Sequence, residues 1–280
     1  MIDIQYFNEL KSYTNYLNIA LSSALQAGDA ILDIYKQSDF QVEMKADNSP
    51  LTLADRKSHQ IISESLQQTG LPILSEEGKE IPYKVRKNWE LFWMVDPLDG
   101  TKEFISRNGE FTVNIALIHN HIPVVGIILA PVPDLLYIGI KGDGSHRIAH
   151  ASKVPSCLEA GNLQNHAELM PLKQSGSKFT AVASRSHSNE KTDAFLESLQ
   201  KEHGDIEIAS KGSSLKFCLI AEGSADVYPR FGPTYEWDTA AGQAIVEAAG
   251  GKVAEVGSGR ILRYNKQDLL NPGFIAYRSR

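Results

Sequence analysis

Cysteine is scarce in this sequence. Its 280 residues include only two cysteines, Cys157 and Cys218. They lie far apart and in no spacing typical of metal-binding cysteines, which argues against a secreted, disulfide-stapled domain. Cys218 stands in the apolar run 217–220, which indicates a buried small hydrophobic side chain. We therefore expect a reducing, cytoplasmic location.

Long hydrophobic runs and an excess of positive charge are also absent. The longest apolar stretch, 122–133, is too short to span a bilayer, and the first residues lack the basic and apolar regions of a signal peptide. The chain has 28 Lys and Arg against 34 Asp and Glu, and its net charge is −6. Because clustered Lys and Arg hold phosphate backbones, a nucleic-acid polymer is not an expected partner.

Several catalytic motifs are missing as well. The sequence has no Walker-type glycine loop, no nucleophile-elbow serine and no His-Glu-x-x-His pair. Its eight histidines show no ligand spacing. Covalent nucleophilic catalysis therefore has no obvious candidate.

The apolar pattern changes along the chain. Residues 6–35 and 52–66 have helical periodicity, and strand-like segments joined by short loops follow them, as in an antiparallel meander. Beyond about residue 150, strands alternate with helices, which is an α/β signature. We expect an α+β domain over 1–150 and an α/β domain over 151–280. The predicted strands are 72–75, 91–95, 111–119, 124–130, 135–140, 179–183, 206–209, 225–228 and 273–277, and the later helices are 189–201, 213–222 and 239–249.

The most specific motif is Asp-Pro-Leu-Asp-Gly-Thr at 96–101. A buried strand delivers Asp96, and Pro97, which has no N–H for a ladder, predicts that the chain turns there. Asp96 and Asp99 can then face one point, while Gly100 permits an unusual backbone angle. The N–H groups of residues 100–102 can point at an anion, as at a helix start. Two carboxylates beside such donors suit hard cations and a phosphate together, although a surface turn is the simpler alternative.

Three weaker motifs are ambiguous when taken alone. Asp238 follows Trp237 and precedes an alanine-rich helix, so it is most simply an N-cap, a role that still leaves one carboxylate oxygen for a metal. Glu76 lies in an acidic pair after the strand 72–75, which is usually solvated surface. Asp47 precedes Asn48 in what is most simply an Asx turn before a helix.

Together these segments resemble the lithium-sensitive, magnesium-dependent phosphatases of the inositol monophosphatase family. The block at 96–101, the Trp-Asp-x-Ala-Ala-Gly segment at 237–242 and Glu76 match that family in order and spacing. The resemblance spans 47–251 and implies a layered α-β-α-β-α sandwich of the α/β class. Within the family the sequence is most similar to the bacterial 3'(2'),5'-bisphosphate nucleotidases, because of Lys-Glu-Phe at 102–104 and Glu-Phe-Thr-Val-Asn at 110–114.

The resemblance also implies roles for individual residues. Two or three Mg²⁺ ions would be held by four carboxylates and one backbone carbonyl and would activate a water for in-line attack, with Asp47 and Thr101 orienting that water. The implied ligands are Glu76, Asp96, the carbonyl of Leu98, Asp99 and Asp238, with Glu76 also counted as catalytic. The implied substrate contacts are Gly100, Thr101, His187, Ser213, Lys216 and Arg230, together with Glu76, Leu98, Asp99 and Asp238.

The implied substrate is adenosine 3',5'-bisphosphate, cleaved to AMP and phosphate, with the sulfated form of that nucleotide as a further candidate in sulfur metabolism. A broad inositol or sugar phosphatase is the nearby alternative, and an inactive metabolite sensor is the alternative from another class. No obligatory protein partner is expected. Peripheral attachment to the cytoplasmic face of the inner membrane, known among relatives, stays open, but no basic amphipathic segment requires it.

Overall fold

The first sheet has seven strands in the order β3-β4-β5-β6-β7-β8-β9. The computed structural model describes residues 4–37, 42–44, 50–154, 166–172, 178–183 and 189–279, with 4–15 as backbone only. Neighbouring strands are antiparallel except β3 and β4, which are parallel, so the predicted meander is confirmed. The strands are β3 Ile73–Ser75, β4 Leu91–Asp99, β5 Thr112–His119, β6 Ile122–Ala130, β7 Leu135–Ile140, β8 Gly144–Ala149 and β9 Glu168–Met170.

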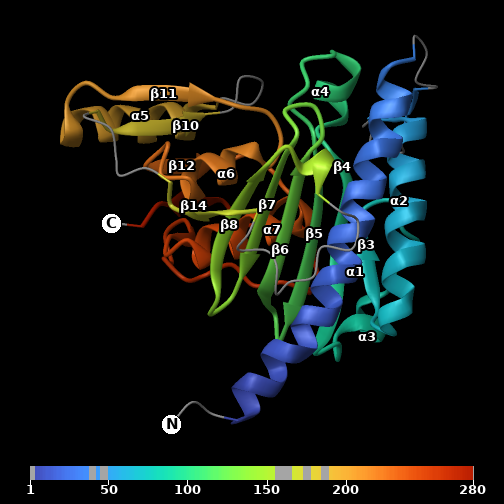
Figure 1. Ribbon diagram of the computed structural model, residues 1–280. Coiled ribbons are helices and arrows are strands. Elements are labelled where there is room, and N and C mark those ends of the chain that lie inside the picture. The colour runs from blue at the N-terminus through green and yellow to red at the C-terminus, as the bar shows by residue number, and fades with distance from the viewer. Residues whose placement is uncertain are drawn as a thin grey trace.

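Two long helices cover one face of this sheet. Figure 1 shows α1 (Ile4–Tyr35) and α2 (Leu53–Leu66) side by side against the strands. Alternate strand residues point to opposite faces, so Trp93 and Val95 join the core under these helices, while Phe92 and Met94 join the core on the other face. The smaller elements here are β1 Glu43–Met44, β2 Pro50–Leu51, η1 Gln67–Thr69, α3 Tyr83–Arg86, α4 Thr101–Ile105 and η2 Ala151–Lys153.

A second sheet of five strands completes the fold. Its order is β11-β10-β12-β14-β13, with β10 parallel to β11 and β12 and the other pairs antiparallel. Helices α6 and α7 share one core with both sheets, and α5 packs on the outer side of the second sheet. The predicted α-β-α-β-α sandwich is therefore confirmed. The elements are β10 Thr180–Ala183, α5 Glu190–His203, β11 Glu207–Ser210, α6 Leu215–Ala221, β12 Val227–Arg230, α7 Glu236–Ala248, β13 Lys252–Glu255 and β14 Phe274–Tyr277.

Helix α7 lies unusually close to the first sheet. A Cβ atom at Gly126 would lie 2.4 Å from the carbonyl oxygen of Ala241, and one at Gly139 would lie 2.5 Å from Cα of Ile245. The small residues Ala241 and Ala244 face these glycines, so the helix backbone rests almost on the strand backbone. This contact fixes where the N-terminal end of α7, and Asp238 with it, stands relative to β4.

Some elements differ from the sequence prediction. Strands β8, β9 and β13 are not predicted by periodicity, because they are short or carry polar residues. Helix α7 begins at Glu236 rather than at residue 239, and β4 continues to Asp99. Within the described part of the chain, no helix combines the length and the apolar character needed to cross a bilayer.

Candidate metal and phosphate site

The site begins at an irregularity in β4. Asp96 pairs with Asn114 of β5, and pairing resumes at Asp99 and Thr112 after a shift of register. The prediction that the chain turns away at Pro97 is therefore wrong: a bulge absorbs the missing N–H, and the strand continues. Asp96 Oδ1 accepts a hydrogen bond from the N–H of Leu98 (3.1 Å). Gly100 then adopts φ 91°, a left-handed conformation that suits glycine, and caps α4.

Two further carboxylates reach the same point from other elements. Glu76 directly follows β3, and its N–H donates to the Val95 carbonyl (3.1 Å), which places it beside the end of β4. Asp238 arrives on the first turn of α7. Carboxylate oxygens of Glu76, Asp96 and Asp238 lie within 4.8 Å of one another. Segments remote in sequence thus converge, as the family resemblance implies.

Asp238 is not the N-cap that the sequence suggests. Tyr235 caps α7 in an extended conformation, and Asp238 is the third helical residue. Its Oδ2 accepts a hydrogen bond from the Tyr235 N–H (2.8 Å). The carboxylate closes the first turn of the helix while it faces Glu76 and Asp96.

Burial and mutual repulsion shape the titration of these acids. The pKa of Asp96 is well above its ordinary range, first because of burial and then because of Glu76, Asp99 and Asp238. Burial raises the pKa of Asp99 to about 6, although the nearby Lys216 lowers it. The pKa of Asp238 is raised by burial, Asp99 and Glu76. An oxygen-only donor set in which the carboxylates raise one another's pKa fits a hard divalent cation such as Mg²⁺.

A cavity of about 420 Å³ opens beside the carboxylates. Lys216 and Arg230 lie on its wall, so acidic and basic side chains face the same space. Asp47 and His187 fall outside the described residues. The other predicted site residues all line the cavity: Glu76, Asp96, Leu98, Asp99, Gly100, Thr101, Ser213, Lys216, Arg230 and Asp238.

Lys216 is buried and held by backbone carbonyls. Its Nζ donates to the carbonyl oxygens of Ser213 (2.7 Å) and Lys211 (3.2 Å). Its pKa is lowered to about 8, mainly by burial, with Asp99 opposing this shift and Arg230 contributing to it. Arg230 donates from Nη2 to the Pro233 carbonyl (3.1 Å), and its buried Nε has no hydrogen-bond partner among the described residues. This part of the cavity wall therefore carries positive charge, and the Arg230 Nε–H is a hydrogen-bond donor without an acceptor among the described residues.

Sequence reasoning missed Asp55. This residue is buried on α2, and its Oδ1 accepts a hydrogen bond from the Thr101 hydroxyl (3.0 Å). Its Oδ2 accepts from both the N–H (2.8 Å) and the hydroxyl (2.5 Å) of Thr52. A Thr-x-x-Asp pattern at a helix start is a capping signature, so the cap was detectable in the sequence, whereas its contact with Thr101 was not.

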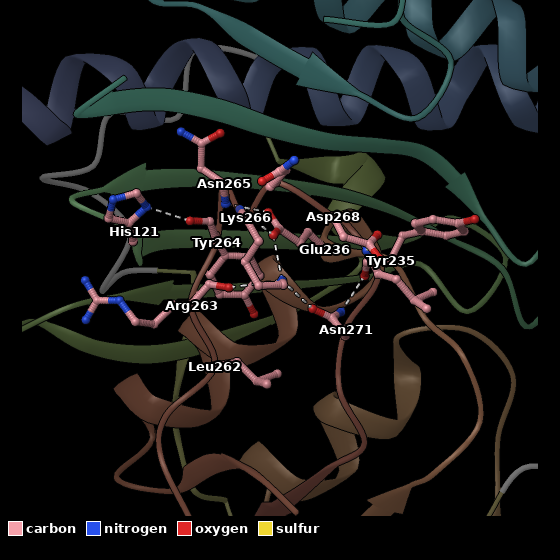
Figure 2. A network of polar contacts seen from close by, with 12 residues as sticks. His121, Tyr235, Glu236, Leu262, Arg263, Tyr264, Asn265, Lys266, Asp268 and Asn271 are labelled. Carbon is pink, nitrogen blue, oxygen red and sulfur yellow. Dashed lines mark hydrogen bonds and ion pairs between the residues drawn. The ribbon is translucent and has the colours of Figure 1, made fainter. Parts of the chain in front are cut away.

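A polar network behind α7 fixes the helix start (Figure 2). Glu236 is fully buried, and its carboxylate accepts from the N–H groups of Asn265 (2.5 Å) and Lys266 (2.9 Å) and from Lys266 Nζ (2.6 Å). The Asn271 amide donates to the Tyr235 carbonyl (2.7 Å). It also donates to the Thr239 hydroxyl (3.0 Å). The loop 263–271 therefore clamps the turn that presents Asp238.

Comparison with known proteins identifies the family of this chain. Residues 12–279 match the inositol monophosphatase family. The chain belongs to that family. The bacterial branch inferred from the sequence is confirmed by relatives named 3'(2'),5'-bisphosphate nucleotidase CysQ. That of Escherichia coli K12 is 43% identical over 255 residues, covering 90% of this chain and 95% of the relative. That of Buchnera aphidicola is 40% identical over 283 residues, covering 99% of each.

Solved structures of family members agree with this placement. The crystal structure of CysQ from Bacteroides thetaiotaomicron is 50% identical, covers 95% of this chain and 97% of that one, and superposes with a TM-score of 0.87. SuhB from Bartonella henselae is 23% identical with a TM-score of 0.70, covers 94% of each chain and supports the fold alone.

Proposed function

We propose that this protein is a Mg²⁺-dependent 3'(2'),5'-bisphosphate nucleotidase that converts adenosine 3',5'-bisphosphate to AMP and phosphate. The sulfated form of the nucleotide is a second substrate in this proposal. The observation that carries it is one cavity lined both by a carboxylate cluster and by the cationic side chains of Lys216 and Arg230. A ligand with two phosphates can place one at the cations held by the carboxylates and the other at Lys216 and Arg230. The relatives that bear the nucleotidase name support the same assignment.

The cation site would be formed by Glu76, Asp96, Asp99, Asp238 and the carbonyl of Leu98. Divalent ions held there would neutralise the phosphoryl oxygens and make a water more acidic. Two or three ions and inhibition by Li⁺ belong to this proposal through the family resemblance. Oxygen ligands from carboxylates and one carbonyl are those that Mg²⁺ prefers.

Thr101 orients the attacking water. Its hydroxyl proton is directed to Asp55, so the oxygen lone pairs remain available to accept a hydrogen bond from water. Asp47 shares this role in the proposal. The N–H groups of the first turn of α4 have no acceptor within the helix and would donate to phosphoryl oxygens bound in the cavity.

Lys216 and Arg230 bind the phosphate that is not cleaved. Both are cationic donors that line the same cavity as the carboxylates, and a charge-assisted contact is stronger than a neutral hydrogen bond. Ser213 and His187 complete the proposed nucleotide pocket.

The nucleotide assignment is tested with Lys216→Ala. Loss of a charge-assisted contact of about 1.5–3 kcal/mol lowers kcat/KM for adenosine 3',5'-bisphosphate by about 10- to 150-fold. Lys178→Ala, which removes an exposed lysine paired with Asp205, is the control and leaves the kinetics unchanged. A panel with inositol phosphate and fructose bisphosphate accompanies it. Unchanged nucleotide kinetics in Lys216→Ala, or a wild type that prefers inositol phosphate, contradicts the assignment.

The metal assignment is tested with Asp99→Asn. Because a bound cation relieves the repulsion among the clustered carboxylates, Mg²⁺ raises the melting temperature of the wild type. In the variant this rise shrinks and phosphate release falls by at least about 100-fold, in line with the loss of a principal electrostatic contribution. A variant that releases phosphate at the wild-type rate contradicts both the metal site and an active role for this cluster.

A further inference from the structure

Three polar side chains of the segment 110–114 contact the loop 211–214, which leads into α6 and Lys216. Thr112 and Asn114 are buried on β5 and, being two residues apart, point to the same face as Ala116 and Ile118, toward α6 and α7. Apolar residues occupy the rest of the described strand interior, so these two polar groups stand out. The metal and phosphate roles assigned above use neither of them.

These side chains form a continuous hydrogen-bonded path. The Ser214 hydroxyl donates to Asn114 Oδ1 (2.7 Å) and lies 2.7 Å from the Thr112 hydroxyl. On its other side, Asn114 Nδ2 donates to Asp99 Oδ2 (3.4 Å). The path thus joins a proposed metal ligand to the residue that begins α6.

Glu110 holds the same loop at residues 211 and 212, just before Ser214. Glu110 Oε2 accepts from the Gly212 N–H (2.9 Å), and Oε1 contacts Lys211 Nζ (3.2 Å). Ser213, between these anchors, has φ 44°, a left-handed conformation uncommon for a residue other than glycine. Its carbonyl and that of Lys211 are the two acceptors that hold Lys216 Nζ.

We infer that Glu110, Thr112, Asn114 and Ser214 form a latch that sets the spacing between Asp99 and Lys216 and thereby selects substrates with two phosphates. This inference rests on the proposed function. In a bisphosphate the sugar fixes the distance between the phosphates, so the cleaved group reaches the carboxylates only if Lys216 stands at the matching distance. A monophosphate makes no contact with Lys216 and does not depend on that spacing. The latch residues are positioning residues.

The test compares kcat/KM for adenosine 3',5'-bisphosphate with kcat/KM for adenosine 3'-monophosphate. Ser214→Ala removes the hydroxyl that joins Asn114 to the loop, and we expect the ratio to fall by about five- to tenfold, the effect of one hydrogen bond. Thr112→Val, which keeps the shape of the side chain, is the second variant. Ser145→Ala removes another buried hydroxyl, which donates to the Ile138 carbonyl in the same sheet, and keeps the wild-type ratio.

A double-variant cycle separates positioning from general damage. If the latch acts through Lys216, Ser214→Ala has no further effect on the ratio when Lys216 is already alanine. An equal loss on both substrates, or an unchanged ratio in both latch variants, overturns the inference while leaving the proposed function standing. A wild type without preference for the bisphosphate overturns the proposed function and the inference with it.

Discussion

The buried carboxylate of Glu236 permits a quantitative test of how the site is held. Glu236→Gln removes the charge opposite Lys266 and turns an NH₂ group toward donors. Breaking a buried ion pair costs about 3–5 kcal/mol, and since Lys266 is 31% exposed, we expect about 2–4 kcal/mol. For a chain of this size the melting temperature then falls by roughly 5–10 °C. Because Glu236 stands two residues from Asp238, the apparent Mg²⁺ affinity also falls by about 10- to 100-fold.

Thermal unfolding and a Mg²⁺ titration of phosphate release measure the two effects. Asp205→Asn is the matched control, since it neutralises the carboxylate of another lysine pair of similar length (2.7 Å) whose side chains are 80% and 49% exposed. Exposed pairs contribute little, so the control keeps the wild-type melting temperature. If Glu236→Gln also keeps it and its Mg²⁺ dependence is unchanged, the clamp on α7 has no role in holding Asp238.

Two further perturbations probe the helix that carries Asp238. Gly126→Ala drives a methyl group into the Ala241 carbonyl. Such overpacking costs about 1–3 kcal/mol and lowers the melting temperature. Gly232→Ala is the control and keeps the wild-type melting temperature, because its backbone is not left-handed and a Cβ atom there would lie 3.7 Å from the nearest atom of Arg230. Burial raises the pKa of Glu247 to about 7. The folded chain therefore binds more protons than the unfolded chain between about pH 4.5 and 7, and stability falls as pH rises through that window. Glu247→Gln removes this pH dependence and is more stable than wild type by about 1–3 kcal/mol at pH 8. Denaturant unfolding at pH 5 and pH 8 measures this. The same difference in unfolding free energy between the two proteins at both pH values would refute the reasoning.

The sequence predicts the parts of the site whose chemistry is local. Asp96 and Asp99 are recognisable because a buried strand leads into them, whereas Glu76, directly after the strand 72–75, is singled out only by the family resemblance. The position of Asp238 within its helix is harder to predict from the sequence. Its position depends on where α7 begins, and the loop 263–271 sets that point through contacts distant in sequence.

Long-range partners account for most of what the sequence does not indicate. The contact of Asp55 with Thr101 and that of Asn114 with Ser214 join elements that no periodicity relates. The extension of β4 past Pro97 has a similar origin: a proline predicts a break, but Thr112 of the neighbouring strand offers pairing to Asp99 after the bulge. The local conformational preference of a residue is overridden where a neighbouring strand supplies its hydrogen-bond partner.

The close seat of α7 on the first sheet has a consequence during synthesis. The strands of the first sheet are translated before α7, which ends at Ala248. Until α7 has been made, the sheet face that carries Phe92, Met94 and Ile128 lacks the helix that covers it. A nascent chain stalled before that helix presents a bare apolar surface, the kind that aggregates or recruits chaperones. Ribosome-bound fragments ending near residue 230 should therefore bind holdase chaperones, and fragments extended past residue 250 should release them.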